Sequence, residues 1–175
     1  MDRLDAATTP LDVLCGDIVD RYHAALHRSL PQIREELAEL CASGGSEALR
    51  NVRIAFDHLA DQIEGHLAKE EHLLFPALEA LAAAQREGQR RPPMVFVALV
   101  HPIRLMETEH LRIEDALDRV RDAVLEVAEP ESLNPRWRRC LASLAQLGRD
   151  LGEHHRAEGD VLFPAALELE RRFLV

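Results

Sequence analysis

One segment of the sequence occurs twice, and it restricts the possible folds more than any other feature. Residues 66–78 read HLAKEEHLLFPAL and residues 154–167 read HHRAEGDVLFPAAL, at an offset of 88 residues (154 − 66). Each copy has a His, a Glu four positions later, and then Leu-Phe-Pro. A spacing of four puts the His and the Glu on the same face of a helix, one turn apart. The repeat therefore predicts two helices with matching faces, which carry two imidazoles and two carboxylates.

Four long segments of the sequence have apolar residues at the three- and four-residue spacing of a helix. They span about 10–42, 47–86, 103–127 and 135–172. Short loops separate them, with Ser46 and Asn134 as expected N-caps. No stretch alternates between apolar and polar residues over the length of a strand, and no hairpin signal is present. The pattern predicts an all-α fold, an up-down-up-down four-helix bundle in which the two copies of the repeat lie on alternate helices.

Three prolines and one apolar segment are expected to shape the helices locally. Pro31 should bend the first helix, because proline lacks the amide proton that an inner turn needs. Pro76 and Pro164 should bend the second and fourth helices about a turn beyond each repeated Glu. Residues 94–100 are apolar and fit either a loop or a short helical turn over one end of the core.

The composition limits the class of protein. The chain of 175 residues fits one domain, 1–175, with its core at about 10–172. A net charge of −10 is unsuitable for binding nucleic acid or an anionic membrane surface, and no apolar run is long enough to cross a membrane. The first residues lack the apolar region of a secretory signal. Three widely spaced cysteines, Cys15, Cys41 and Cys140, are typical of reduced thiols. We therefore predict a cytoplasmic protein, either monomeric or a homodimer.

The repeated residues also predict a metal site. Imidazole and carboxylate together suit iron, manganese or zinc, and a carboxylate can bridge two ions. One pair of this kind, His66 with Glu70 or His154 with Glu158, is common on a solvated helix face. Two pairs with the same Leu-Phe-Pro continuation favour a metal site over that interpretation.

Further histidines are candidates for the same site. His110 lies in the third helix and His23 in the first, so that each predicted helix supplies one His. His27 is four positions from His23 and shares its face. The remaining histidines are interpreted as surface or boundary residues: His58, His72, His101 and His155.

These residues together resemble the hemerythrin-like, HHE cation-binding family. The resemblance spans about residues 10–170, and its motifs occur in order: Tyr22-His23, His66-x3-Glu70-Glu71-x-x-Leu-Phe-Pro, Met106-Glu107-x-Glu109-His110 and His154-x3-Glu158-x3-Leu-Phe-Pro. It is closest to the branch called repair of iron centres (RIC) proteins. The resemblance implies two non-haem iron ions, joined by an oxo or hydroxo bridge, inside a four-helix bundle. The implied ligands are His23, His66, Glu70, His110, His154 and Glu158.

The sequence departs from that branch in two respects. RIC proteins usually have a further His about 21 residues after the first, where this chain has Gly44. A replacement ligand could come from His27, from Glu114 or from water; alternatively, the site holds one iron or another divalent metal. The branch also carries a small N-terminal cysteine-containing domain, whereas this sequence starts directly at the predicted bundle, and Cys15 is too isolated to replace that domain.

Four functions fit these observations. The first is a sensor or binding protein for O₂ or NO, and the second is an iron-handling protein that serves damaged iron–sulfur proteins under oxidative or nitrosative stress. The third is a di-iron enzyme that consumes peroxide or NO, in which Glu71, Glu107 or Glu109 would manage protons. The fourth is an interaction module without metal. We expect a metal-binding or iron-handling protein rather than a classical enzyme. A ferritin-like protein is disfavoured because Glu-x-x-His occurs once, and a zinc hydrolase because HExxH is absent.

Overall fold

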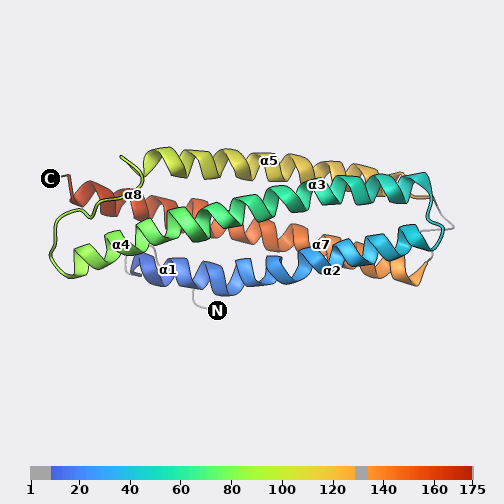
Figure 1. Ribbon diagram of the computed structural model, residues 1–175, viewed down its shortest axis with the longest axis horizontal. Helices are drawn as coiled ribbons and strands as arrows, with labels where there is room; N and C mark the ends of the chain where they lie inside the picture. The colour runs from blue at the N-terminus through green and yellow to red at the C-terminus, as the bar shows by residue number, and fades with distance from the viewer. Residues whose placement is uncertain (1–8, 129–133, 175) are drawn as a thin grey trace.

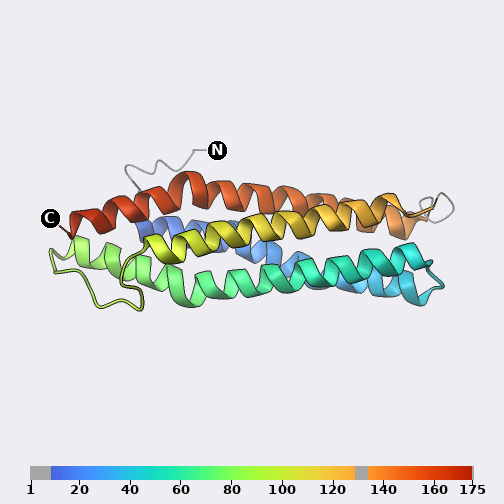
Figure 2. The same ribbon diagram turned by 90° about the horizontal axis from the view of Figure 1, so that it is seen from above.

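Four helical columns run side by side along the long axis of the molecule (Figure 1). The structure is a computed structural model that describes residues 9–128 and 134–174, and within these residues it contains helices and no strands. The columns are α1 (Leu11–Ile18), η1 (Val19–His23) and α2 (Ala24–Ala42); α3 (Glu47–Lys69), η2 (Glu70–Leu74) and α4 (Phe75–Arg86); α5 (Val100–Leu125); and α7 (Pro135–Ala157), η3 (Glu158–Leu162) and α8 (Phe163–Arg172). The chain direction alternates from each column to the next (Figures 1 and 2). The prediction of an up-down-up-down four-helix bundle is confirmed.

The helix boundaries follow local chemistry that is visible in the sequence. The hydroxyl of Ser46 accepts the amide of Leu49 at 3.2 Å, and Asn134 Oδ1 accepts the amide of Arg136 at 2.9 Å. Both predicted N-caps are confirmed. Gly44 follows the end of α2 with a φ of 94°, a left-handed conformation that favours glycine. Among the helices in the described ranges, none is both long and apolar enough to cross a membrane.

The segment between α4 and α5 contains no helix up to Leu99, which decides the open question about residues 94–100. One buried carboxylate fixes this segment. Glu170 of α8 accepts the backbone amide of Leu99 at 3.1 and 3.2 Å and receives Arg91 Nη2 at 2.7 Å. The same Arg91 nitrogen donates to the carbonyl of Val97 at 3.0 Å. Glu170 therefore ties the long connection and the start of α5 to the last helix.

We predict that Glu170→Ala lowers the free energy of unfolding by about 1–3 kcal/mol, because the amide of Leu99 and the guanidinium of Arg91 lose their buried acceptor. Urea unfolding measures the change. The matched control is Glu168→Ala, which removes a neighbouring carboxylate that pairs with Arg171 and Arg172 at the surface. The control should change stability by less than about 0.5 kcal/mol. Equal effects of the two substitutions would contradict the proposed role of Glu170.

Two separate apolar clusters fill the bundle. One lies toward the α2–α3 connection and includes Leu26, Leu67 and Leu151; the other lies toward the α4 and α8 end and includes Ile18, Leu74 and Leu162. Between them the chain buries polar side chains instead, all less than a tenth exposed: His23, His66, Glu70, His110, His154 and Glu158. A polar layer inside an otherwise apolar core is energetically costly unless its groups find partners. The burial of this polar layer therefore indicates a functional site.

Three columns change their winding at this layer. The elements η1, η2 and η3 are wide, π-type turns, in which the amides of Ala24, Phe75 and Phe163 bond to the carbonyls five residues earlier. In both repeats the wide turn begins at the Glu and ends directly before the Phe that precedes Pro76 or Pro164, and the bend expected at these prolines stays a prediction. In addition, α2 continues through Pro31 as one helix, and the departure from α-helical winding in that column lies earlier, at residues 19–23. π-type turns are frequent at functional sites.

The wide turns allow each repeated helix to keep a long row of residues buried. Successive positions four apart in the second column are all buried: His66, Glu70, Leu74 and Leu78. Such a row drifts about 40° per step in an ideal α-helix of 3.6 residues per turn, so its ends would face about 120° apart. The additional residue of the wide turn offsets this drift. The fourth column repeats the arrangement with His154, Glu158, Leu162 and Ala166.

Candidate metal centre

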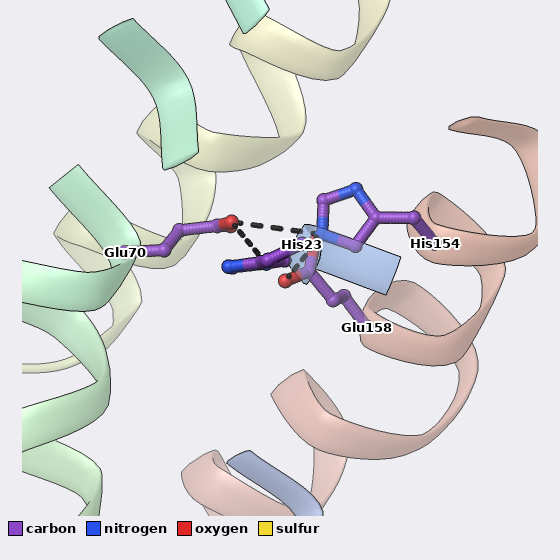
Figure 3. Close-up of side chains that lie close together, drawn as sticks. All are labelled: His23, Glu70, His154 and Glu158. Atoms are coloured by element: carbon purple, nitrogen blue, oxygen red, sulfur yellow. Dashed lines mark hydrogen bonds and ion pairs between the residues drawn. The ribbon is translucent and has the colours of Figure 1, made fainter. Parts of the chain in front are cut away.

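Six buried side chains from the four columns form two overlapping groups of possible metal ligands. The first group, here named position A, is bounded by His23, His154, Glu70 and Glu158; the second, position B, by His66, His110, Glu70 and Glu158. Figure 3 shows the four side chains of position A converging. These six residues are the ligands that the family resemblance implies. Their geometry fits a dinuclear site in which both carboxylates are shared.

Position A brings imidazole nitrogens and carboxylate oxygens within a few ångströms of one another. His23 Nε2 lies 3.1 Å from His154 Nε2 and 3.4 Å from Glu70 Oε2. His154 Nε2 is 3.6 Å from the same oxygen and 3.2 Å from Glu158 Oε1. All four side chains are fully buried. None of the four side chains around position A is therefore in contact with solvent.

Position B repeats this arrangement with the other oxygen of each carboxylate. His66 Nε2 lies 3.1 Å from His110 Nε2 and 3.3 Å from Glu70 Oε1. His110 Nε2 lies 3.1 Å from Glu158 Oε2. Glu70 therefore presents Oε2 to position A and Oε1 to position B, and Glu158 presents Oε1 to A and Oε2 to B. This is the orientation that a bridging carboxylate requires.

The donor atoms fit metal ions in two independent ways. Two donors that bind one ion at about 2.0–2.2 Å each lie roughly 2.8–3.6 Å apart in octahedral or tetrahedral geometry. The separations of 3.1–3.6 Å in both positions agree with this range. Moreover, the oxygens of Glu70 and Glu158 accept no well-aligned hydrogen bond from the described part of the chain, and they lie 3.1–3.6 Å from imidazole nitrogens of the same centre. Buried carboxylates without hydrogen bonds are rare and call for a cation.

The electrostatics of the centre favour positive charge. Burial alone would lower the pKa of His154, but the carboxylates of Glu158 and Glu70 outweigh it and raise this pKa to about 10. Burial would raise the pKa of Glu158, yet His154 and His110 lower it well below its ordinary value. At His66, burial prevails over Glu70 and lowers the pKa, which keeps this imidazole neutral and able to bind metal. The two carboxylates thus attract a proton or any other cation to the centre.

A second set of side chains contacts the histidines from behind. His23 Nδ1 hydrogen-bonds Glu71 Oε1 at 2.8 Å, and the same oxygen meets His27 Nε2 at 3.0 Å. Such contacts fix the tautomer and ring orientation of a metal-binding histidine. Burial would raise the pKa of Glu71, but the hydrogen bonds from His27 and His23 lower it overall, so this carboxyl is ionised.

His66 has an equivalent arrangement on its outer side. His66 Nδ1 lies 3.3 Å from Glu109 Oε2, and Glu109 Oε1 receives the Lys69 ammonium at 2.5 Å. Glu71 and Glu109 are two of the acids that could transfer protons in a di-iron enzyme. The structure places each of them in contact with a histidine of the centre. Glu107, the third of these acids, is exposed.

The two additional ligand candidates lie outside both positions. His27 is half exposed and contacts Glu71 rather than a donor of either position. Glu114 is 59% exposed, and its Oε1 contacts His155 Nδ1 at 3.4 Å. His155, interpreted from sequence as pointing away from the site, instead stacks on His110 with ring centroids 3.9 Å apart. Burial and the neighbouring His110 lower its pKa to about 2, so it packs as a neutral ring.

Gly44 lies beyond the end of α2, 21 residues (44 − 23) after His23. At a rise of 1.5 Å per helical residue, that distance is roughly 30 Å along the bundle. A histidine at residue 44 could not reach either position. The departure from the RIC pattern at Gly44 therefore removes no ligand from this centre.

We predict that His27→Ala and Glu114→Gln each bind as many metal ions per chain as wild type, because neither side chain reaches position A or B. Anaerobic loading followed by metal analysis measures the stoichiometry. His23→Ala, at the same helix face as His27, is the matched comparison and should lose the ion at position A. Loss of an ion in either of the first two variants would restore that residue as a ligand.

Four imidazoles and two shared carboxylates within a helical bundle define a metal-binding bundle protein. Comparison with known families agrees, because the family model described as "Hemerythrin HHE cation binding domain" matches residues 16–93 and 101–173. The chain belongs to this hemerythrin HHE cation-binding family. The expected resemblance is confirmed at the level of the family and of the fold.

Three relatives of the chain share one name. The chain is 32% identical over 165 residues to the "Iron-sulfur cluster repair protein YtfE" of Edwardsiella ictaluri (strain 93-146), covering 93% of this chain and 69% of that protein. It is 28% identical over 163 residues to the protein of that name from Yersinia pseudotuberculosis serotype O:1b (strain IP 31758), covering 92% and 68%. The protein of that name from Yersinia pestis (strain Pestoides F) gives the same identity and coverage. The similarity to the RIC branch thus extends over nearly all of this chain.

Proposed function

We propose that this protein handles iron for the repair of iron–sulfur clusters: it holds two iron ions in positions A and B and gives up iron to damaged acceptor proteins. The observation that carries the proposal is the shared orientation of Glu70 and Glu158, each of which presents one oxygen to each position. The names of the YtfE relatives support the choice of iron and of iron–sulfur acceptors.

The donor set suits iron that must be held and then released. Each position is bounded by two imidazoles and two shared carboxylates, and no thiolate takes part. Nitrogen and oxygen donors bind ferrous iron without the strong preference for soft metals that thiolates confer. Four protein groups also leave coordination positions free at an ion that can take six, through which an acceptor's ligands could approach.

The test is iron transfer to a cluster-depleted iron–sulfur protein. The chain is loaded anaerobically with ferrous iron and mixed with the apo acceptor, sulfide and thiol, in the presence of a chelator that captures free iron. Recovery of cluster absorbance is expected with the loaded wild-type protein. An equal amount of free ferrous iron in the presence of the chelator should give none. If the loaded protein restores no more cluster than free iron does, iron donation is overturned.

A second candidate function is the binding of O₂ or NO, favoured by the same free coordination positions. Bound iron would supply the affinity for a diatomic molecule, while the surrounding residues bury the centre and hold its histidines. An optical spectrum of the anaerobic iron-loaded protein, before and after addition of NO or O₂, tests this function. A reversible spectral change without loss of iron would favour it over donation.

We further propose a cytoplasmic location, which fits the absence of disulfides among Cys15, Cys41 and Cys140.

A further inference from the structure

The two metal positions have equal donor sets but unequal surroundings. At position A, both imidazoles are completely buried, whereas at position B His110 is 9% exposed. A groove of about 320 Å³ between α3 and α5 is lined by Gly65, Lys69 and Glu109, among others. Gly65 precedes His66 in the chain, and a side chain at residue 65 would meet nothing within 4 Å. One imidazole of position B is thus partly exposed, whereas both imidazoles of position A are completely buried.

The carboxylates behind the two positions also differ in their charge environment. Glu71, behind His23, shares its oxygen with the imidazole of His27. Glu109, behind His66, is instead paired with the Lys69 ammonium. An ionised carboxylate behind a histidine makes it a stronger metal ligand. Because Lys69 offsets much of the charge of Glu109, His66 gains less from its partner than His23 gains from Glu71.

The ammonium of Lys69 also acts directly on a cation at position B. Lys69 pairs with Glu109, the carboxylate that contacts His66, and a positive charge there disfavours a cation at position B through space. The side chain of Lys69 is 43% exposed, whereas Glu109 is only 13% exposed, so the ammonium lies on the solvent side of the carboxylate. The exposure of the donor His110, the weaker partner of His66 and the charge of Lys69 point the same way, whereas Glu71 behind position A is 25% exposed and Glu109 behind position B only 13%.

We propose that the two positions differ in lability: the ion at position B, held by His66 and His110, exchanges with solution through the α3–α5 groove, whereas the ion at position A is retained. The proposal rests on the proposed function, since it names which of two iron ions is available for donation. Glu109 and Lys69 act as positioning residues here, because neither belongs to the donor groups themselves.

The experiment measures release of ferrous iron from the anaerobically loaded full chain to excess ferrozine, a chromogenic chelator. Wild type should release its iron in two phases of one ion each, with rates that differ on the order of 10-fold to 100-fold, the usual effect of an altered partner behind a metal ligand. One phase for both ions would overturn the proposal. If stoichiometry shows no bound iron, the proposed function itself fails; if transfer to an iron–sulfur acceptor fails while two phases remain, only the donation step fails.

Lys69→Gln distinguishes the mechanism from simple exposure. Removing the ammonium leaves Glu109 free to strengthen His66 and relieves repulsion at position B, so the fast phase should slow by roughly tenfold. The matched control, His27→Gln, changes the corresponding outer residue of position A and should leave the fast phase unchanged. Both side chains are at the surface, so folding is not at risk. A Lys69→Gln variant that alters the slow phase, or a His27→Gln variant that alters the fast phase, would overturn the assignment.

Discussion

Replacing Glu158 by glutamine is expected to remove metal from both positions at once. The substitution keeps the size of the side chain but removes the charge and one oxygen donor, and Glu158 faces His154 of position A at 3.2 Å and His110 of position B at 3.1 Å. Loss of a ligand should weaken binding by more than the 10- to 100-fold that loss of an outer partner costs. At an iron concentration that saturates wild type, the variant should hold less than one ion per chain.

The control for this result is His154→Ala, which removes a donor from position A alone. It should retain the ion at position B, so metal analysis should find about one ion per chain if the two positions bind independently of that histidine. Circular dichroism establishes that both variants keep their helices. A Glu158→Gln variant that binds one ion as tightly as wild type would contradict the shared role of this carboxylate.

Removing the metal is expected to lower the melting temperature by about 5–11 °C. Metal binds only the folded chain, and saturation at 100 times the dissociation constant stabilises it by about 2.7 kcal/mol. In a protein of this size, each kcal/mol shifts the melting temperature by about 2–4 °C. The structural cause is the polar layer between the two apolar clusters, where the carboxylates of Glu70 and Glu158 accept no well-aligned hydrogen bond from the described residues. Thermal unfolding of iron-loaded and chelator-treated protein measures the difference.

Glu158→Gln provides the matched control for the thermal experiment as well. Because this variant should bind little metal, its melting temperature should be nearly the same with and without iron. A wild-type protein whose melting temperature does not respond to iron would show that the buried layer is stable without a cation. The metal centre would then lack the energetic role that its burial implies.

Much of the fold could be predicted because its signals are local. The repeated His–Glu pairs, the caps Ser46 and Asn134, and the apolar spacing each depend on residues within one or two helical turns. They predicted the second and fourth columns, 47–86 and 135–172, at the bounds that the structure gives. The six residues that line positions A and B were predicted partly from spacing and partly from the family resemblance, since His23 and His110 carry no local signal of their own.

The remaining features could not be predicted because they depend on winding and on contacts between columns. In the first helix, the four-residue spacing of an ideal helix predicts that Tyr22 follows Ile18 on the buried face. The wide turn instead buries His23, five residues after Ile18. The stacking of His155 on His110 joins two columns 45 residues (155 − 110) apart in the chain. The partners Glu71 and Glu109 were recognisable as acids near the site, but only the structure shows which histidine each one contacts.

The wide turns have a consequence for how such a chain can change its length. Each one holds a single residue more than an α-helical turn while it completes about the same rotation, so removing one residue between a repeated Glu and its Leu-Phe-Pro should return the turn to α-helical winding. Phe75 or Phe163 would then stay in its apolar cluster. A further inserted residue has no such accommodation and would rotate everything beyond it by about 100°. The repeated segment should therefore tolerate the deletion of one residue better than an insertion.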